Sequence, residues 1–457
     1  MSAPLWTSAE IEQATGGTAS ELFDVGGIAF DSREIEPGFL FVAMPGTVAD
    51  GHDFVAGAFL KGATAALVSR PVDGPHVLVA DVPAALTALA IAARARMSGK
   101  VVGVTGSVGK TSTKEALAAA LERRARGRVH RSVKSYNNHT GVPLSLARMP
   151  RDSRYAVLEM GMNHAGEISA LTRLVRPHVA LITAIGPAHI ENLGSLDGIA
   201  DAKGEIFQGL EEEGVAIIPA NTPQRDRLIR AARRHAGETI TFGAPDAEVS
   251  ALHFVPADGG GSLVTARLVH CELTFTVSQR GEHWVSNALA VLAAVEAVGA
   301  DVAAAGLALA DLGGLKGRGE RHRVALPGGE ALLIDESYNA NPASVAATLK
   351  TLATEPGRHL LVLGAMRELG THSDELHAGL ADPISDAEVR EVILVGEETQ
   401  PLERALSGRA EVARVGSPDE AADLLLQRLA PGDAVLVKAS NSVGLAKLVE
   451  RVAGAGR

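Results

Sequence analysis

Short apolar runs alternate with longer segments in which apolar residues recur at helical spacing through most of this chain. Such alternation is typical of parallel sheets whose strands are joined by helical crossovers. In the middle of the chain, the runs that we expect to be strands are 101–104, 155–160, 179–185 and 215–219. After residue 330 they are 331–335, 359–364, 392–396, 411–415 and 434–438. The pattern therefore predicts two α/β units, of which the second is doubly wound.

Two other parts of the chain depart from this alternation. The first 98 residues hold shorter strand-type runs, and Thr7-Ser8-Ala9-Glu10 opens a short helix there with the pattern of a capping box. Between the two α/β units, the runs that read as strands are 249–256, 262–269 and 272–278. The simplest account of these three runs is an antiparallel edge on the central sheet. Two alanine-rich helices are expected after them, at 283–298 and 302–312.

Glycine-containing links near Ser98-Gly99 and at 313–319 divide the chain into three parts. A length of 457 residues agrees with this division, because a single core stops growing at roughly 250–300 residues. We predict an α/β protein with a small mixed α/β domain over 1–98 and a central parallel-sheet domain over 99–312. A Rossmann-like, doubly wound domain is expected over 313–457.

Composition limits the class of protein. The 43 basic and 54 acidic residues give a net charge of −11, which argues against a general nucleic-acid binder. The single cysteine, Cys271, excludes an internal disulfide framework and fits a reducing compartment. The N-terminus lacks the basic and apolar regions of a signal peptide, and no apolar run approaches membrane-spanning length. We expect a cytoplasmic protein without stable membrane association.

One stretch, from Val104 to Thr113, joins a strand-type run to a helical pattern through a glycine turn. Glycines allow backbone N–H groups to converge on phosphate oxygens at a helix N-terminus. Lys110 would reach the β- and γ-phosphates, and the Thr111 hydroxyl would bind Mg²⁺. Val104 stands where the common form of this motif has its first glycine. The predicted ATP-binding loop consists of Thr105, Gly106, Ser107, Val108, Gly109, Lys110, Thr111 and Ser112.

Polar residues follow the central strands at the sheet edge where ligands gather in open α/β folds. Glu159 ends one strand-type run, His189 follows the next, and Lys203 lies on the helical segment after it. Taken singly, each residue also has a structural interpretation. Glu159 could be a strand-end cap, His189 a loop histidine and Lys203 a solvated helix residue. Their placement beside the phosphate loop favours a Mg²⁺ site that includes Glu159 and His189.

Further motifs give the chain a resemblance to the Mur ligases over essentially its whole length. They are Asn137-Asn138-His139-Thr140-Gly141, Glu159-Met160-Gly161-Met162, Ala188-His189-Ile190-Glu191, Ala202-Lys203-Gly204-Glu205, Asn287-Ala288-Leu289, Gly317-Arg318 and Asp335-Glu336-Ser337-Tyr338-Asn339-Ala340-Asn341-Pro342. The phosphate loop also matches the form of that family, which lacks a glycine at 104. Mur ligases are ATP-dependent enzymes that form amide bonds in bacterial cell-wall precursors.

Within that family, Ser337-Tyr338-Asn339-Ala340-Asn341-Pro342 and Asn137-Asn138 most resemble the members that add a dipeptide. The resemblance implies a ligase that joins D-alanyl-D-alanine to the carboxylate of UDP-N-acetylmuramoyl-tripeptide. ATP and Mg²⁺ would be its cofactors, an acyl phosphate its intermediate, and peptidoglycan precursor synthesis its setting. We expect a monomer.

The resemblance also assigns roles to residues. The catalytic residues it implies are Lys110, His189, Lys203 and Arg318. ATP would further contact Asn287, Arg318 and Asp335. The implied metal ligands are Thr111, Glu159, His189 and Lys203, the last as a carbamate formed with CO₂. The implied substrate-binding residues are Ser32, Arg33, Thr47, His52, Asn137, Asn138, Tyr338, Asn339 and Asn341. Those of the first domain also read as turn and cap residues.

Two positions depart from the family pattern. Ala365 replaces an acidic residue and Asn441 replaces an arginine, so the resemblance does not say how the third domain holds the dipeptide. Three alternatives remain open. Another Mur-type ligase, or an enzyme similar to folylpolyglutamate synthase, would use the same ATP chemistry on a different acceptor. A P-loop ATPase of another class would hydrolyse ATP without a carboxylate substrate.

Overall fold

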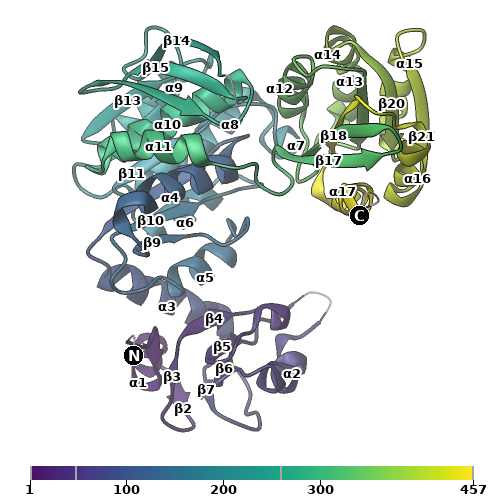
Figure 1. Cartoon of the computed structure of the whole chain (residues 1–457). Coiled ribbons are helices and arrows are strands. Elements are labelled where there is room, and N and C mark those ends of the chain that lie inside the picture. The colour runs from purple at the N-terminus through teal and green to yellow at the C-terminus, as the bar shows by residue number, and fades with distance from the viewer. Residues whose placement is uncertain (1–2, 47–48, 258–259, 455–457) are drawn as a thin grey trace.

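The computed structural model describes residues 3–46, 49–257 and 260–454, which form three domains (Figure 1). In Figure 1 the first domain lies below the central domain, and the third domain lies to the right of the central domain. The central domain therefore lies between the other two along the chain and in space. None of the helices in the described ranges combines the length and apolar composition that a membrane crossing requires.

The first domain is built on a five-stranded sheet in the order β2-β7-β6-β5-β4. Its strands are β2 (Thr18–Ala19), β4 (Gly27–Ala29), β5 (Phe39–Val42), β6 (Ala65–Val68) and β7 (His76–Leu78). Strands β4 to β7 pair in parallel, and β2 pairs antiparallel with β7. The predicted capping box is present at α1 (Ser8–Thr15): the Thr7 hydroxyl accepts from Glu10 N–H, and the Glu10 carboxylate accepts from Thr7 N–H.

The first domain shares a hydrophobic core with a helix of the central domain, α5 (Gly141–Ala147). Leu144 and Ala147 of α5 belong to the same buried cluster as Trp6 and Ile11. The Trp6 indole N–H also donates to the Ala147 carbonyl at 2.9 Å. Because these contacts are buried, they fix the first domain against the central one.

The central sheet has six parallel strands in the order β13-β12-β11-β8-β10-β9. Their bounds are β8 (Lys100–Thr105), β9 (Val129–Arg131), β10 (Tyr155–Glu159), β11 (Val179–Ile182), β12 (Val215–Pro219) and β13 (Glu238–Phe242). The sequence pattern predicted the inner four strands but missed β9 and β13, which lie at the two edges and mix polar with apolar residues. Since β8 lies between β10 and β11, the loop after β8 opens at the middle of the sheet.

The central helices cover both faces of this sheet. They are α4 (Lys110–Ala125), α6 (Glu167–Val175), α7 (Ile190–Leu193), α8 (Leu196–Gly204), α9 (Arg225–Ala232), α10 (Glu282–Ala297) and α11 (Val302–Asp311). Helix α3 (Val82–Arg96) connects the first domain to the central one, since Leu86 lies in the core of the first domain and Ala90 in that of the second.

The prediction of an antiparallel edge on the central sheet is wrong. Strands β14 (Ser250–Pro256), β15 (Ser262–Arg267) and β16 (Glu272–Val277) form a separate antiparallel sheet. One isolated bridge, between Phe242 and Val249, connects the two sheets. Val264 and Phe275 of this small sheet share a hydrophobic cluster with α10, so burying its apolar face requires the helix opposite it rather than an extension of the larger sheet.

The third domain has a six-stranded sheet in the order β17-β18-β22-β19-β20-β21. Its strands are β17 (Glu320–Leu326), β18 (Gly329–Glu336), β19 (His359–Gly364), β20 (Val389–Val395), β21 (Glu411–Val415) and β22 (Ala434–Lys438). The five predicted strands are parallel, which confirms the doubly wound pattern. Strand β17 was not predicted, and it pairs antiparallel with β18 at one edge. It begins with four consecutive charged or polar residues, Glu320 to Arg323, so no apolar run marks the strand.

The helices of this domain flank the sheet. They are α12 (Pro342–Leu352), α13 (Ser373–Ala378), α14 (Ala381–Asp386), α15 (Gln400–Ala405), α16 (Pro418–Arg428) and α17 (Leu445–Gly454). The start of α12 is fixed by a second capping box, in which Asn341 accepts from Ser344 N–H and the Ser344 side chain accepts from Asn341 N–H.

Candidate active site

The predicted phosphate loop connects β8 to α4 in the conformation that anion binding requires. Gly106 and Gly109 have φ angles of 152° and 82°. A Cβ atom on Gly106 would lie 1.9 Å from Thr183 Oγ1, and one on Gly109 would lie 3.0 Å from Asn287 Oδ1. Only glycine fits at 106, and the loop backbone stays accessible to a phosphate at the N-terminus of α4.

Side chains hold this loop in place. The Ser107 hydroxyl donates to the Gly186 carbonyl at 2.9 Å and accepts from Gly186 N–H at 3.0 Å. The Lys110 ammonium donates to the Gly106 carbonyl at 2.6 Å, and burial lowers the pKa of this lysine. The loop is therefore rigid, and its lysine lies against the backbone that would surround a phosphate.

A carboxylate lies directly behind the phosphate loop. Glu159, at the end of β10, is 1% exposed. Its Oε2 accepts from the Thr111 hydroxyl at 2.8 Å, and its Oε1 accepts from the Asn137 amide at 2.8 Å. These hydroxyl, carboxylate and amide oxygens are the hard ligands that Mg²⁺ prefers, so the residues present fit the predicted metal.

His189 and Lys203 are the other two residues predicted to bind the metal. His189 has a left-handed backbone, with φ of 61°, and its Nδ1 is 2.7 Å from Oε2 of Glu368 in the third domain. Lys203, on α8, is 1% exposed, and burial together with the charge of Lys110 holds its pKa well below the usual 10.5. Glu205 is not its counter-ion, because the Glu205 carboxylate accepts from the N–H groups of Gly166 and Ser169.

The residues predicted to contact the nucleotide meet where the central and third domains face each other. Asn287, on α10, lies beside Gly109. The Arg318 guanidinium stacks on the Tyr338 ring, 4.1 Å from its centroid. Asp335 is buried, and its two oxygens accept from Gly317 N–H and Ser337 N–H, so this carboxylate fixes the linker that carries Arg318.

The third domain supplies one wall of the site. Lys438 is buried, pairs with Glu336 at 3.3 Å and donates to the Asn339 carbonyl at 2.9 Å. Burial lowers the pKa of Lys438. Of the two departures from the family pattern, Ala365 is buried behind this wall, whereas Asn441 is exposed at its surface.

A cleft of about 670 Å³ collects most of the predicted residues. Those that line it are Ser107, Val108, Gly109, Lys110, Thr111, Ser112, Asn137, Asn138, Glu159, His189, Asn287, Arg318, Tyr338, Asn339 and Asn341. Thr105, Gly106, Lys203 and Asp335 are not among its lining residues. Sequence reasoning missed Glu368 and Ser135, which also line the cleft. Ser135 stands in the polar run before Asn137, and that run was the signal that could have identified it.

The predicted residues of the first domain lie apart from the cleft. The exposed Arg33 side chain pairs with Asp31 at 2.7 Å, and Ser32 precedes it on the same short 3-10 helix. His52 uses both ring nitrogens within its domain: Nδ1 contacts Asp50 at 2.7 Å and Nε2 accepts from Ser69 N–H at 3.0 Å. Thr47 lies outside the described residues.

Family models match most of the chain. One described as the Mur ligase middle domain matches residues 104–295, and one described as Mur ligase, glutamate ligase domain matches residues 317–441. A third, described as Mur ligase family, catalytic domain, matches residues 24–122. The three matches follow the order of the three domains.

Curated relatives agree with these matches. The UDP-N-acetylmuramoyl-tripeptide–D-alanyl-D-alanine ligase of Escherichia coli (strain K12) is 37% identical over 382 residues, which cover 83% of each chain. The enzyme of that name from Bacillus subtilis (strain 168) is 36% identical over 436 residues, covering 93% of this chain and 92% of its own.

Solved structures extend the likeness to the fold. A crystal structure of MurF from Acinetobacter baumannii has a TM-score of 0.85 at 31% identity, covering 98% of this chain and 99% of its own. MurF ligase from Thermotoga maritima, solved in complex with ADP, has a TM-score of 0.78 at 28% identity, covering 94% and 97%. On this agreement of motifs, domain order and fold, the chain belongs to the Mur ligase family.

Proposed function

We propose that this chain uses ATP to join D-alanyl-D-alanine to the terminal carboxylate of UDP-N-acetylmuramoyl-tripeptide. The observation that carries the proposal is the composition of the cleft. A phosphate loop, a buried carboxylate and side chains of the third domain face one space of about 670 Å³. Relatives that span nearly the whole chain are named for this reaction.

The reaction requires two anions to approach each other, because a peptide carboxylate attacks the γ-phosphorus of ATP and displaces ADP. We assign the neutralisation of this charge to Lys110 of the central domain and Arg318 of the third. The acyl phosphate that forms is then attacked by the amine of the dipeptide, and phosphate leaves. Closure of the third domain over the cleft would exclude the water that hydrolyses an acyl phosphate.

Mg²⁺, when bound, supplies further positive charge at the phosphate oxygens. Thr111 and Glu159 would hold it together with His189, which lines the same cleft. Lys203 fits a carbamate ligand, because carbamate formation requires a neutral amine and the pKa of this buried lysine is well below its usual value. Asn287 and Asp335 would serve the nucleotide, the first directly and the second by fixing the linker before Arg318.

The first domain would bind the UDP end of the substrate, at Ser32 and Arg33. The exposed guanidinium of Arg33 pairs with Asp31, and on substrate binding it would exchange this pairing for the diphosphate. His52 would also contact this end of the substrate, and Asn137, Asn138, Tyr338, Asn339 and Asn341 would lie along the peptide. We infer a monomer that works in the cytoplasm, where its nucleotide substrates are made.

The test is a product assay with all candidate acceptors. The chain is incubated with ATP, Mg²⁺ and D-alanyl-D-alanine, each UDP-muramoyl peptide is added separately, and products are identified by mass spectrometry. We expect an amide product only with the tripeptide. An enzyme similar to folylpolyglutamate synthase is one of the alternatives left open by the sequence, so a pteroylglutamate with glutamate is included. Product from the folate pair alone would overturn the proposal.

A further inference from the structure

The loop between β9 and α5, residues 132–138, contacts all three domains. Lys134 and Tyr136 reach Glu34 in the first domain. Ser135 and Asn137 lie on the catalytic side, where Ser135 contacts Tyr338 of the third domain and Asn137 donates to Glu159. Successive residues of this loop thus serve the first domain and the active site in turn.

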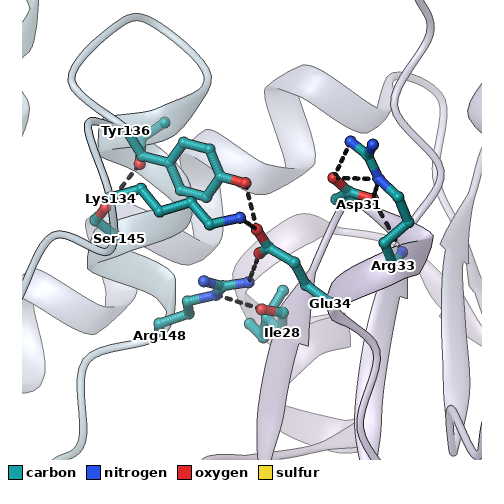
Figure 2. A network of polar contacts seen from close by, with 9 residues as sticks. Ile28, Asp31, Arg33, Glu34, Lys134, Tyr136, Ser145 and Arg148 are labelled. Atoms are coloured by element: carbon teal, nitrogen blue, oxygen red, sulfur yellow. Dashed lines mark hydrogen bonds and ion pairs between the residues drawn. The ribbon is translucent and has the colours of Figure 1, made fainter. Parts of the chain in front are cut away.

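Glu34 is the point at which the first domain holds the loop (Figure 2). Its carboxylate accepts from the Tyr136 hydroxyl at 2.7 Å, from the Arg148 guanidinium at 3.2 Å and from the Lys134 ammonium. Three donors on one carboxylate outweigh the effect of burial and lower the pKa of Glu34. Arg148 also donates to the Ile28 carbonyl, so it remains anchored when Glu34 changes.

Tyr136 attaches the loop to the core of the first domain. Its ring lies 5.3 Å from that of Phe30, and both rings pack against the buried cluster of that domain. Burial, followed by the Glu34 carboxylate, raises the pKa of Tyr136 to about 12. The phenol therefore stays protonated at neutral pH and remains a donor to Glu34.

A buried lysine of the central domain also binds this loop. Lys114, on α4 three residues after Thr111, is fully buried and donates to the carbonyls of Ser132 and Lys134 at 2.8 Å each. Lys134 has a left-handed backbone, with φ of 52°, a conformation that is uncommon for a non-glycine residue. The same loop carries Ser135, whose hydroxyl is 3.5 Å from that of Thr111.

We propose that Glu34 is a positioning residue that sets this loop, so that binding of the UDP end and binding of nucleotide at the cleft favour each other. Glu34 ends the short 3-10 helix that carries Ser32 and Arg33. A substrate bound at those two residues would therefore also affect the position of Glu34. The inference rests on the proposed function, because it assigns the UDP end to that helix. It adds a coupling residue that itself touches no reacting atom.

The experiment measures coupling between the two sites. Affinity for a non-hydrolysable ATP analogue with Mg²⁺ is measured by calorimetry, alone and with saturating UDP-N-acetylmuramoyl-tripeptide. We expect at least a roughly 5-fold gain in the wild type, the lower end of typical coupling between sites. In Glu34→Gln the ratio should fall towards one, because the neutral amide loses the Lys134 pairing. In Tyr136→Phe the affinity gain should be reduced in part.

Glu10→Gln is the matched control. Glu10 also pairs across the first and central domains, with Arg151, but it does not contact the loop. If Glu34 had only a structural role, Glu34→Gln would lower the melting temperature, as Glu10→Gln does, but it would leave the affinity ratio unchanged. If Glu34→Gln does not fold, Lys134→Met and Tyr136→Phe supply the same measurement.

Two results overturn the inference alone: a wild-type ratio of one, or a wild-type ratio retained in Glu34→Gln, in either case with normal product formation. Absence of product from the wild type overturns the proposed function and this inference together. The inference is supported if the affinity gain disappears in Glu34→Gln and is retained in Glu10→Gln.

Discussion

Two threonines on one helix give the sharpest test of the metal site. Thr111 and Thr113 are both buried near the start of α4, and Thr→Val keeps the size and branching of either side chain. The Thr111 hydroxyl donates to Glu159 at 2.8 Å. The Thr113 hydroxyl has no partner among the described residues. Within the described part of the chain, Thr→Val therefore removes a hydrogen bond at position 111 but only an unpaired hydroxyl at position 113.

The expected changes in the free energy of unfolding follow from these contacts. Thr111→Val removes a hydrogen bond to a buried carboxylate, which costs about 1.5–3 kcal/mol. Thr113→Val removes a hydroxyl that was desolvated without compensation, so stability should stay the same or rise by up to ~2 kcal/mol. Urea denaturation of the two variants, followed by circular dichroism, measures both values.

Activity separates the two variants further. Thr111→Val should lower the apparent affinity for Mg²⁺ by roughly 10–100-fold, because both a metal ligand and the hydrogen bond to Glu159 are lost. Thr113 does not line the cleft, so Thr113→Val should keep the wild-type kcat and Mg²⁺ dependence. Titration of Mg²⁺ in a phosphate-release assay measures this. A normal Mg²⁺ curve for Thr111→Val, or a larger loss of stability in Thr113→Val than in Thr111→Val, would refute the reasoning.

Three further predictions follow from the site and the fold. Lys203→Ala should be nearly inactive and should regain part of its activity in acetate, since a small carboxylate can replace a carbamate; no rescue by any carboxylate would contradict this. Asn441→Arg should leave the KM for D-alanyl-D-alanine equal or lower, because residue 441 is exposed at the cleft and a guanidinium binds carboxylates; a large rise would place the dipeptide elsewhere. Burial, with the nearby charge of Lys100, lowers the pKa of His178 from 6.5 to about 4, and its Nδ1 accepts from Val101 N–H. Unfolding exposes a histidine that binds a proton more readily, so stability should fall as pH drops from about 6.5 to about 4, and less steeply in His178→Asn; an equal slope in urea titrations would exclude His178 as a source.

The structure gives physical reasons for what the sequence pattern missed in the fold. Apolar runs identify strands that are buried on both faces, and this predicted β8, β10, β11 and β12 of the central sheet. Edge strands have one side in water and tolerate charge, as β17 does, so the same search overlooks them. The strands β14 to β16 were located but assigned to the wrong sheet, since pairing partners depend on which apolar faces meet.

The sequence by itself determined the phosphate loop and the family motifs. Those features depend on local constraints, such as the left-handed glycine at 109 and a lysine directly after it, and a short segment contains them completely. Only the tertiary structure decided which distant residues complete the site. Glu368 reaches His189, and Glu34 reaches Tyr136, across separations in sequence that no spacing rule describes. Their contacts exist because separate domains pack against one another, and that packing is a property of the whole chain.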